Sequence, residues 1–443
     1  MRYIAGVLFL CVAALPYFGM LWHGEQASGP AVAGKPTETL TIVSPHRREV
    51  RQEYSRGFAE RMGREGRNVE IRWLDVGGTS KILKDLESRY ATNPDKPGVD
   101  LLFGGGVAPY YTAIQKGWLD SVGVAPETLA GIPKLCAGAP VYDPEGRWFG
   151  VALSGFGILY SRPLVARMHL PVPAGWEDLA RPEYFSWVAS GDPRSSGSVH
   201  MCYEIILQAY GLERGWSLLT RLCANVRNFG ESGGTTPREV AAGEVPAGMV
   251  IDQYAQTVID AVGDNLLVFV LPDRTTMIGP DAIGALRGCN RDLSRAFIEY
   301  TLSAEGQRLL YQPVGTNGQR YALYRLPVRE DLYRDEPALR TNPYQYGSGF
   351  AYDETLGNRR WDLINDLIGV WMIDAHPDLT RAWKAVIRRG CRPEEVAELC
   401  RLPVPAAEFD ALAKEWKKSR QKLEITGRWA HEAQERYKRL ESP

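Results

Sequence analysis

The sequence contains few of the patterns on which common enzyme chemistry depends. Only six of its 443 residues are histidines, and neither an HExxH zinc motif nor a GxxxxGKS/T phosphate-binding loop is present. No CxxC pair and no cysteine and histidine set has the spacing of a zinc site. Asp192 and Asp252 are candidates for a carboxylate pair, but nothing in the sequence places them together. We therefore expect a binding protein without a cofactor, and not an enzyme.

An excess of charge of either sign is also absent. The chain carries 52 basic and 53 acidic residues, a formal net charge of -1. A nucleic-acid partner would need a basic surface, so none is expected. A chain of 443 residues exceeds what a single hydrophobic core usually fills, and two or more lobes follow.

The chain opens with its longest apolar run. Arg2 precedes a run of about 20 mostly apolar residues, and Ala31-Val32-Ala33 has the small-x-small pattern of a cleavage site. Residues 1–33 are therefore predicted to be a signal peptide. An uncleaved membrane anchor is the alternative, because the run is nearly long enough to span a bilayer. In both cases the rest of the protein is exported to the periplasm or the extracellular space.

The cysteines after this segment are even in number. Such a count in an exported chain permits disulfides, but the sequence leaves their pairing open. The residues are Cys136, Cys202, Cys223, Cys289, Cys391 and Cys400.

The rest of the chain predicts an α/β protein with two lobes. Short apolar strands alternate with helical patterns, which is typical of parallel sheets covered on both faces. Lobe one is expected to comprise residues 38–148 and 280–326, with the chain returning to extended structure at 282–288, and lobe two residues 149–279. Strand patterns then fade, and tryptophans recur at helical spacing over residues 327–443. That segment is predicted to be a helical extension whose tryptophans are packing surfaces.

Small and hydroxyl residues recur where the predicted strands end. Ligands bind at the carboxyl ends of strands in open α/β sheets, and backbone amides at helix N-termini bind anions. Helix caps and turns favour the same residue types, so a single such residue is weak evidence for a ligand site. The prediction of a binding site depends on the recurrence of these residues at equivalent places in both lobes. The candidate ligand-binding residues are Ser44, His46, Arg47, Gly78, Thr79, Ser80, Gly105, Ser154, Ser196, Ser198, Thr235, Asp252 and Tyr254.

Several of these residues lie in stretches that resemble a known family. The stretches are SPHRREV, VGGTSKIL, DLLFGGG, GDPRSSGS, VAAGEVPAGMVIDQYA and AFIEYTLSAEGQRLL. Together they make residues 39–326 similar to the extracellular solute-binding proteins of bacterial ABC importers, in the branch named for ferric iron. The resemblance implies the type II periplasmic-binding fold, in which two α/β lobes close around one ligand. It also implies docking on an ABC permease in the inner membrane.

The resemblance leaves the ligand open. Ferric-binding members place two adjacent tyrosines late in the second lobe, whereas this sequence has Asp252-Gln253-Tyr254-Ala255 there. Fe(III) prefers anionic oxygen ligands, so the missing tyrosine removes a donor and a charge. A small phosphorylated or phosphonate-like solute, bound without a metal, is therefore favoured, and His46 is expected to make uptake sensitive to pH. The alternatives are ferric iron held by His46 and Tyr254, and a periplasmic sensor or enzyme that reuses the fold.

Overall fold

A computed structural model describes most of the chain after the predicted signal peptide. The prediction for residues 1–33 lies outside the described residues. The Ser80 side chain also lies outside them. Beyond residue 33, the structure leaves out residues 335, 337, 338, 340, 341, 347–349, 417, 442 and 443.

Lobe one is built on a parallel sheet. Strand β1 (Thr37–Val43) lies between β2 (Asn68–Leu74) and β3 (Leu101–Phe103) and is parallel to both. Strand β12 (Ile278–Leu286) continues the sheet antiparallel to β3. Residues Ile42 and Val43 of β1 point to opposite faces and are both fully buried, as expected for a strand covered on both faces. The helices of this lobe are α2 (Arg48–Arg64), α3 (Thr79–Thr92), α4 (Ala108–Gln115), α12 (Arg291–Leu302) and α13 (Ala304–Arg308).

Lobe two repeats the same plan. Strand β8 (Val188–Gly191) is parallel to β9 (Val226–Gly230) and to β10 (Ala247–Ile251). Strand β11 (Leu267–Val270) lies on the other side of the long strand β7 (Phe149–Ser161). The helices of this lobe include α8 (Gly197–Tyr210), α9 (Leu212–Asn225), α10 (Thr235–Ala241) and α11 (Asp252–Val262).

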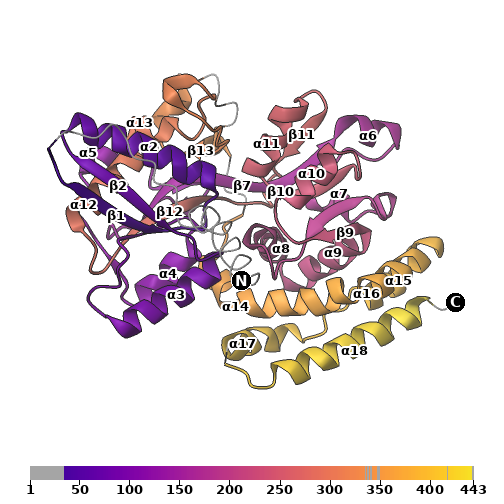
Figure 1. Ribbon diagram of the computed structural model, residues 1–443. Helices are drawn as coiled ribbons and strands as arrows, with labels where there is room; N and C mark the ends of the chain where they lie inside the picture. Colours follow the sequence, from indigo (N-terminus) through magenta and orange to yellow (C-terminus); the bar gives the residue numbers. More distant parts are fainter. Residues whose placement is uncertain are drawn as a thin grey trace, which may run out of the picture.

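Strand β7 runs through both lobes. Its first half pairs with β12, from Phe149 to Gly155, and its second half pairs with β10, from Phe156 to Tyr160. All of its residues are buried, which explains its almost unbroken apolar sequence. The sheets of the two lobes therefore join into one sheet at β7 (Figure 1).

The chain after lobe one first returns to this junction and then becomes helical. Strand β13 (Leu326–Pro327) pairs with β7 opposite Leu153 and Ala152. Two short 3-10 helices follow, η3 (Glu330–Arg334) and η4 (Pro343–Gln345). The remaining helices are α14 (Glu354–Ile368), the π-helix η5 (Gly369–Asp374), α15 (His376–Arg388), α16 (Pro393–Leu399), α17 (Ala406–Trp416) and α18 (Lys422–Glu441).

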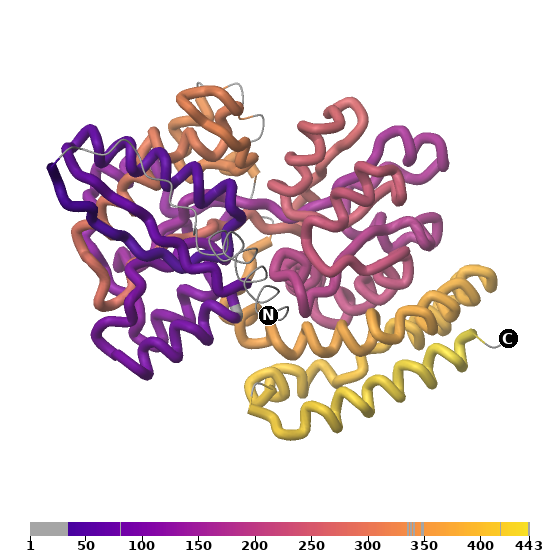
Figure 2. Tube along the Cα trace, in the orientation of Figure 1, coloured from indigo at the N-terminus to yellow at the C-terminus, as the bar shows by residue number. Residues whose placement is uncertain are grey.

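These helices share the hydrophobic core of lobe two. They run along one side of that lobe (Figure 2), and Trp371 and Trp383 are buried in the same cluster as Trp216 of α9. The Trp383 indole also donates to Asn225 Oδ1, at 2.8 Å. Tryptophans at helical spacing here form packing surfaces, because burial of one face of each helix fixes it on its neighbours.

The cysteines of the described chain are unpaired, so no disulfide links Cys391 to Cys400. Within the described residues, none of the helices has the length and apolar character needed to span a bilayer.

Candidate functional site

The glycine-rich loop after β3 lies between two predicted site residues of lobe one. A Cβ atom at Gly104 would come within 2.7 Å of the His46 ring, and one at Gly105 within 2.7 Å of Thr79 Oγ1. Both glycines also have positive φ, so the loop can pass between these side chains only without Cβ atoms. Gly78 precedes Thr79 as the N-cap residue of α3. The loops that follow three neighbouring strands thus meet here.

A cluster of hydroxyl groups marks the facing edge of lobe two. The Ser196 and Ser198 Oγ atoms are 3.2 Å apart at the start of α8, and the Ser196 side chain makes no capping hydrogen bond. A Cβ atom at Gly233 would lie 2.4 Å from Ser198 Oγ and 3.2 Å from the Tyr254 ring. We call residues 196–200 the serine turn. Its hydroxyls, Gly233 and Tyr254 therefore share one surface.

The two lobes touch across this surface. The Arg47 guanidinium of lobe one lies over the Tyr254 ring of lobe two, 5.3 Å from its centre. Arg47 is exposed, whereas Tyr254 is half-buried. The contact places a cation that no ion pair engages in the described structure on the Tyr254 ring, which borders Gly233 as Ser198 does.

The floor between the lobes is an ionic cluster centred on Asp281 of β12. Its carboxylate accepts hydrogen bonds from His46 Nε2 at 2.7 Å, from the Gly106 amide at 3.1 Å and from Arg325 Nη1. We call this arrangement the Asp281 clasp. Burial opposes the charge, yet His46 and Arg325 hold the pKa of Asp281 far below its usual range. The pairing of β12 with β7 shifts register between Asp281 and Ala282, and such an irregularity re-aims a strand side chain.

The clasp gives His46 a role different from the predicted one. Because a carboxylate only accepts hydrogen bonds, the proton of the imidazole is on Nε2, and Nε2–H donates a hydrogen bond to Asp281. Burial lowers the pKa of His46, although Asp281 opposes this effect, so the imidazole is neutral at pH 7. A neutral, buried histidine supplies no charge to an anion. His46 thus donates a hydrogen bond within the clasp, and its predicted effect on the pH dependence of uptake stays a prediction.

Asp252 is a second group that bears on pH dependence. Its carboxylate accepts hydrogen bonds from the Gly155 amide at 2.8 Å and from the Gln253 amide at 2.6 Å. Burial raises its pKa to about 7, while these bonds, Arg325 and the Ser154 hydroxyl lower it. Asp252 therefore changes charge near neutral pH, beside the floor of the site.

The protein's own groups already engage several of the predicted binding residues. His46 donates to Asp281, and Asp252 accepts a hydrogen bond from the Gly155 amide. The Ser44 hydroxyl accepts a hydrogen bond from the His46 backbone amide at 3.1 Å, and Ser44 is almost fully buried. Thr235 Oγ1 bonds to Ser232 Oγ at 3.2 Å. Of the other predicted residues, Arg47 contacts Tyr254 across the lobes, Ser198 lies beside Gly233 as Tyr254 does, Ser196 bonds to Ser198, and Thr79 lies against the loop after β3.

A metal site was the alternative for two of the predicted residues. His46 is committed to Asp281, and the Tyr254 ring lies under the Arg47 guanidinium. A cation over the tyrosine opposes the binding of a second, trivalent cation there. The described part of the chain contains no group of three or more histidine, cysteine and acidic residues that could hold a metal ion.

One further stretch matches an enzyme pattern. Residues 230–234 read GESGG, which has the GxSxG spacing of a nucleophile elbow. Ser232 is exposed, and its hydroxyl pairs with Thr235 and not with a histidine. The geometry therefore lacks the base that a serine nucleophile requires.

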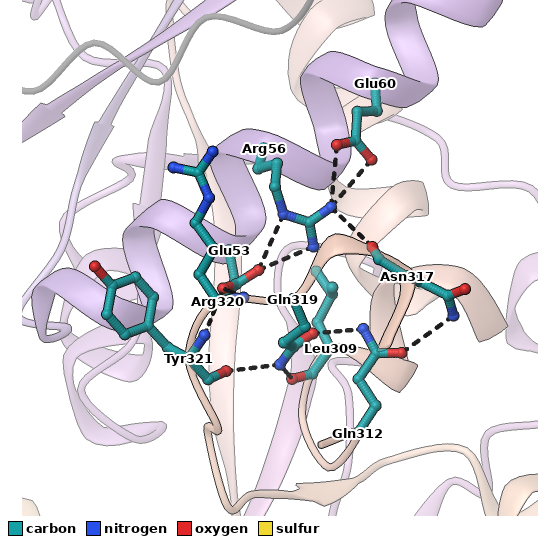
Figure 3. Close-up of polar contacts among 9 residues, drawn as sticks. All are labelled: Glu53, Arg56, Glu60, Leu309, Gln312, Asn317, Gln319, Arg320 and Tyr321. Carbon is teal, nitrogen blue, oxygen red and sulfur yellow. Dashed lines mark hydrogen bonds and ion pairs between the residues drawn. The ribbon is translucent and has the colours of Figure 1, made fainter. Parts of the chain in front are cut away.

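Arg325 reaches the clasp from a segment that a polar network fixes (Figure 3). Glu53 of α2 is buried, and its carboxylate accepts hydrogen bonds from the backbone amides of Arg320 and Tyr321 at 2.6 and 2.8 Å. Arg56 links Glu53 to Glu60 and to the Asn317 carbonyl. The Gln319 side chain holds the same segment from the other side, by donating to the Leu309 and Tyr321 carbonyls. Helix α2 thereby sets the path of the chain that leads to Arg325.

Part of the chain matches a known protein family. Residues 97–314 match the family model described as bacterial extracellular solute-binding protein. The match confirms the predicted resemblance to this family over these residues. The family consists of binding proteins that act outside the cytoplasm, which agrees with the predicted export.

A curated relative matches over much of the chain. It is the phosphoglycerate transport regulatory protein PgtC of Salmonella typhimurium, which is 28% identical over 263 residues. The match covers 58% of this chain and 63% of PgtC, so this chain spans less than two thirds of the relative.

Solved structures confirm the predicted fold. AfuA of Actinobacillus pleuropneumoniae, a periplasmic binding protein with fructose-6-phosphate bound, is 18% identical with a TM-score of 0.58. That match covers 75% of this chain and 98% of AfuA. Iron-bound HitA of Pseudomonas aeruginosa is 19% identical with a TM-score of 0.55, covering 71% of this chain and 96% of HitA. At these identities the likeness establishes the two-lobed fold, and it leaves the ligand to be argued from the site.

The polar network yields a test of how the clasp is supported. We expect Glu53→Ala to lower the free energy of unfolding by about 2–4 kcal/mol, because two buried amides and Arg56 lose their acceptor. Chemical denaturation would measure this loss. The control is Glu60→Ala, which removes a more exposed partner of the same Arg56 and is expected to cost less than about 1 kcal/mol. Equal losses in the two variants would show that the amide contacts of Glu53 contribute nothing.

Proposed function

We propose that the protein captures a small anionic solute that carries a phosphate or phosphonate group between its lobes. It then delivers this solute to an ABC permease in the inner membrane. The observation that carries the proposal is the serine turn: two hydroxyls 3.2 Å apart at the start of a 14-residue helix, in the neighbourhood of Tyr254, whose ring Arg47 of the facing lobe covers.

The chemistry of this surface suits a phosphate group. The N-terminus of a long helix presents free amides and a partial positive charge, and serine hydroxyls add directional donors. Arg47 supplies a full charge from the opposite lobe, so an anion bound to both would favour closure. Proteins similar to this one include a phosphoglycerate transport regulatory protein and a fructose-6-phosphate-bound binding protein, which supports the same ligand class.

Ferric iron is the less favoured ligand. The fold is also that of iron-bound HitA, which keeps iron among the candidates. Tyr254 is the one tyrosine of the Asp252–Ala255 stretch, and Arg47 covers its ring. Fe(III) requires several anionic oxygen donors, whereas the serine turn offers neutral hydroxyls.

A role in ligand sensing is a second candidate function. The observation that favours it is the name of the relative PgtC, a phosphoglycerate transport regulatory protein. In that case the same site would bind the anion, and the partner would be a membrane receptor instead of a permease. We propose neither catalysis nor a cofactor for the protein, and no nucleic-acid partner.

The ligand class is tested by calorimetry with fructose-6-phosphate, 3-phosphoglycerate, inorganic phosphate, fructose and ferric citrate. We expect at least one phosphorylated compound to bind and fructose not to bind. Ser198→Ala should weaken that binding about tenfold or more, because a hydrogen bond to a charged group contributes about 1.5–3 kcal/mol.

Ser195→Ala is the matched control for this experiment. The Ser195 hydroxyl donates to the Asp192 carbonyl, outside the cluster with Ser198, so its loss should leave the dissociation constant unchanged. Binding of ferric citrate alone would overturn the proposed ligand class. Equal affinity of Ser198→Ala and the unaltered protein would remove the serine turn from the site.

Asp252 predicts a pH dependence of anion binding. Its pKa of about 7 leaves the carboxyl mostly protonated at pH 6 and mostly charged at pH 8. An anion is repelled by the charged form, so affinity should rise several-fold as the pH falls from 8 to 6. The measurement should use sulfate or a sugar sulfate, since the charge of these ligands is constant over this range. In Asp252→Asn the dependence should disappear, and a slope that persists in this variant would assign it to another group.

A further inference from the structure

Helix α14 lies against both lobes. The Asn358 amide donates to Thr112 Oγ1 of α4 in lobe one, at 3.4 Å. Two residues further on, Arg360 forms a buried ion pair with Glu204 of α8 in lobe two, at 2.7 Å. Figure 1 shows α14 starting beneath the junction of the lobes and running along lobe two. The helix is therefore placed to act on the site from outside it.

The serine turn is packed against one residue of α14. The Trp361 ring is stacked on the His200 imidazole, with the ring centres 3.6 Å apart and a 27° angle between the planes. The same indole would lie 3.8 Å from a Cβ atom at Gly197. The His200 amide in turn donates to the Ser196 carbonyl at 3.0 Å. Trp361 thus backs the single helical turn that presents Ser196 and Ser198.

A second contact fixes the His200 ring. Its Nδ1 donates to Asn365 Oδ1 at 2.6 Å, because an amide oxygen can only accept. Burial lowers the pKa of His200 to about 3, so the ring stays neutral and keeps this tautomer. His200 is fully buried. Its orientation is therefore set by α14 through a stacked ring on one side and a hydrogen bond at its edge.

The ion pair of Glu204 and Arg360 fixes the two helices lengthwise. Arg360 Nε also donates to both Glu204 oxygens, at 2.8 and 3.0 Å, and both residues are nearly or fully buried. A buried pair with several hydrogen bonds is costly to break, because either partner alone would leave a charge without compensation. The helices α8 and α14 consequently cannot slide past one another without a large loss of stability.

We infer that α14 is a positioning element of the binding site, in which Trp361 and Asn365 hold the serine turn in its ligand-binding orientation. The inference rests on the proposed function, since it assigns the affinity of the site partly to the helical extension. The contacts that join these two side chains to the serine turn are made to His200 and at Gly197. Their effect is transmitted through His200 and the backbone of residues 197–200.

The inference is tested with Trp361→Ala, Trp361→Phe and Asn365→Leu in the full chain. We expect Trp361→Ala to bind the phosphorylated ligand at least tenfold more weakly, and Asn365→Leu several-fold more weakly with its volume nearly conserved. Trp361→Phe should recover most of the affinity because it restores a ring over His200. Unchanged dissociation constants in Trp361→Ala and Asn365→Leu would overturn the inference.

The control is Trp429→Ala. Trp429 is buried in the same extension, but it stacks on Trp416 of α17, with ring centres 5.2 Å apart. This variant should lower the melting temperature as Trp361→Ala does, while its dissociation constant stays within twofold of the unaltered protein. A tenfold loss of affinity in Trp429→Ala as well would show general destabilisation, which contradicts a specific role of Trp361.

Hydrogen exchange in the ligand-free protein separates this inference from the proposed function. The amides of His200 and of the residues that follow it in α8 should exchange faster in Trp361→Ala and Asn365→Leu than in Trp429→Ala, because the His200 amide is hydrogen-bonded to Ser196. If the unaltered protein bound no phosphorylated compound, the proposed function would fail, and this exchange pattern would still decide whether α14 holds the serine turn. Equal exchange in the three variants would overturn the inference without reference to any ligand.

Discussion

Asp281 is the mostly buried charge around which three loops of lobe one are arranged. A carboxylate beneath the junction of two lobes is stable only if its lost hydration is replaced. His46, the Gly106 amide and Arg325 replace it, and they come from the chain after β1, the loop after β3 and the segment before β13. One side chain therefore ties together three loops that would otherwise be free to separate.

The clasp also determines which groups remain for a ligand. By engaging His46 and Gly106, it uses donors of lobe one that an anion would otherwise bind. Asp252 does the same to the Gly155 amide. The donors that these two carboxylates leave unused include Arg47, which lies over Tyr254, and the hydroxyls of the serine turn. The floor of the site is thus structural, and the walls are left for recognition.

The extension completes this division between support and recognition. Glu53 and its partners support the floor from α2, and Trp361 and Asn365 support one wall from α14. Recognition residues on flexible turns bind tightly only when a surrounding shell removes their freedom to move. Trp361 and Ser198 are far apart in the sequence, but in the fold Trp361 packs against the serine turn that contains Ser198.

The sequence predicts the lobes and the walls better than the floor. Apolar periodicity locates β1, β2 and β7, and the chemistry of helix N-termini singles out Ser196 and Ser198. Asp281 was missed because Pro280 interrupts the strand pattern, so extended chain was expected only from residue 282, whereas β12 begins at Ile278. Arg325 and Trp361 carry no local signal, since their roles arise from contacts between distant segments. An acidic residue within an apolar stretch, as in Asp281, is the one sign that sequence alone offered.

The central claim is that a negatively charged group draws the two lobes together. Small-angle X-ray scattering with and without ligand tests it most directly, because closure of a two-lobed protein reduces the radius of gyration. The account predicts compaction with fructose-6-phosphate or phosphoglycerate and none with fructose. Compaction with ferric citrate alone, or an unchanged radius with every anion, would contradict it.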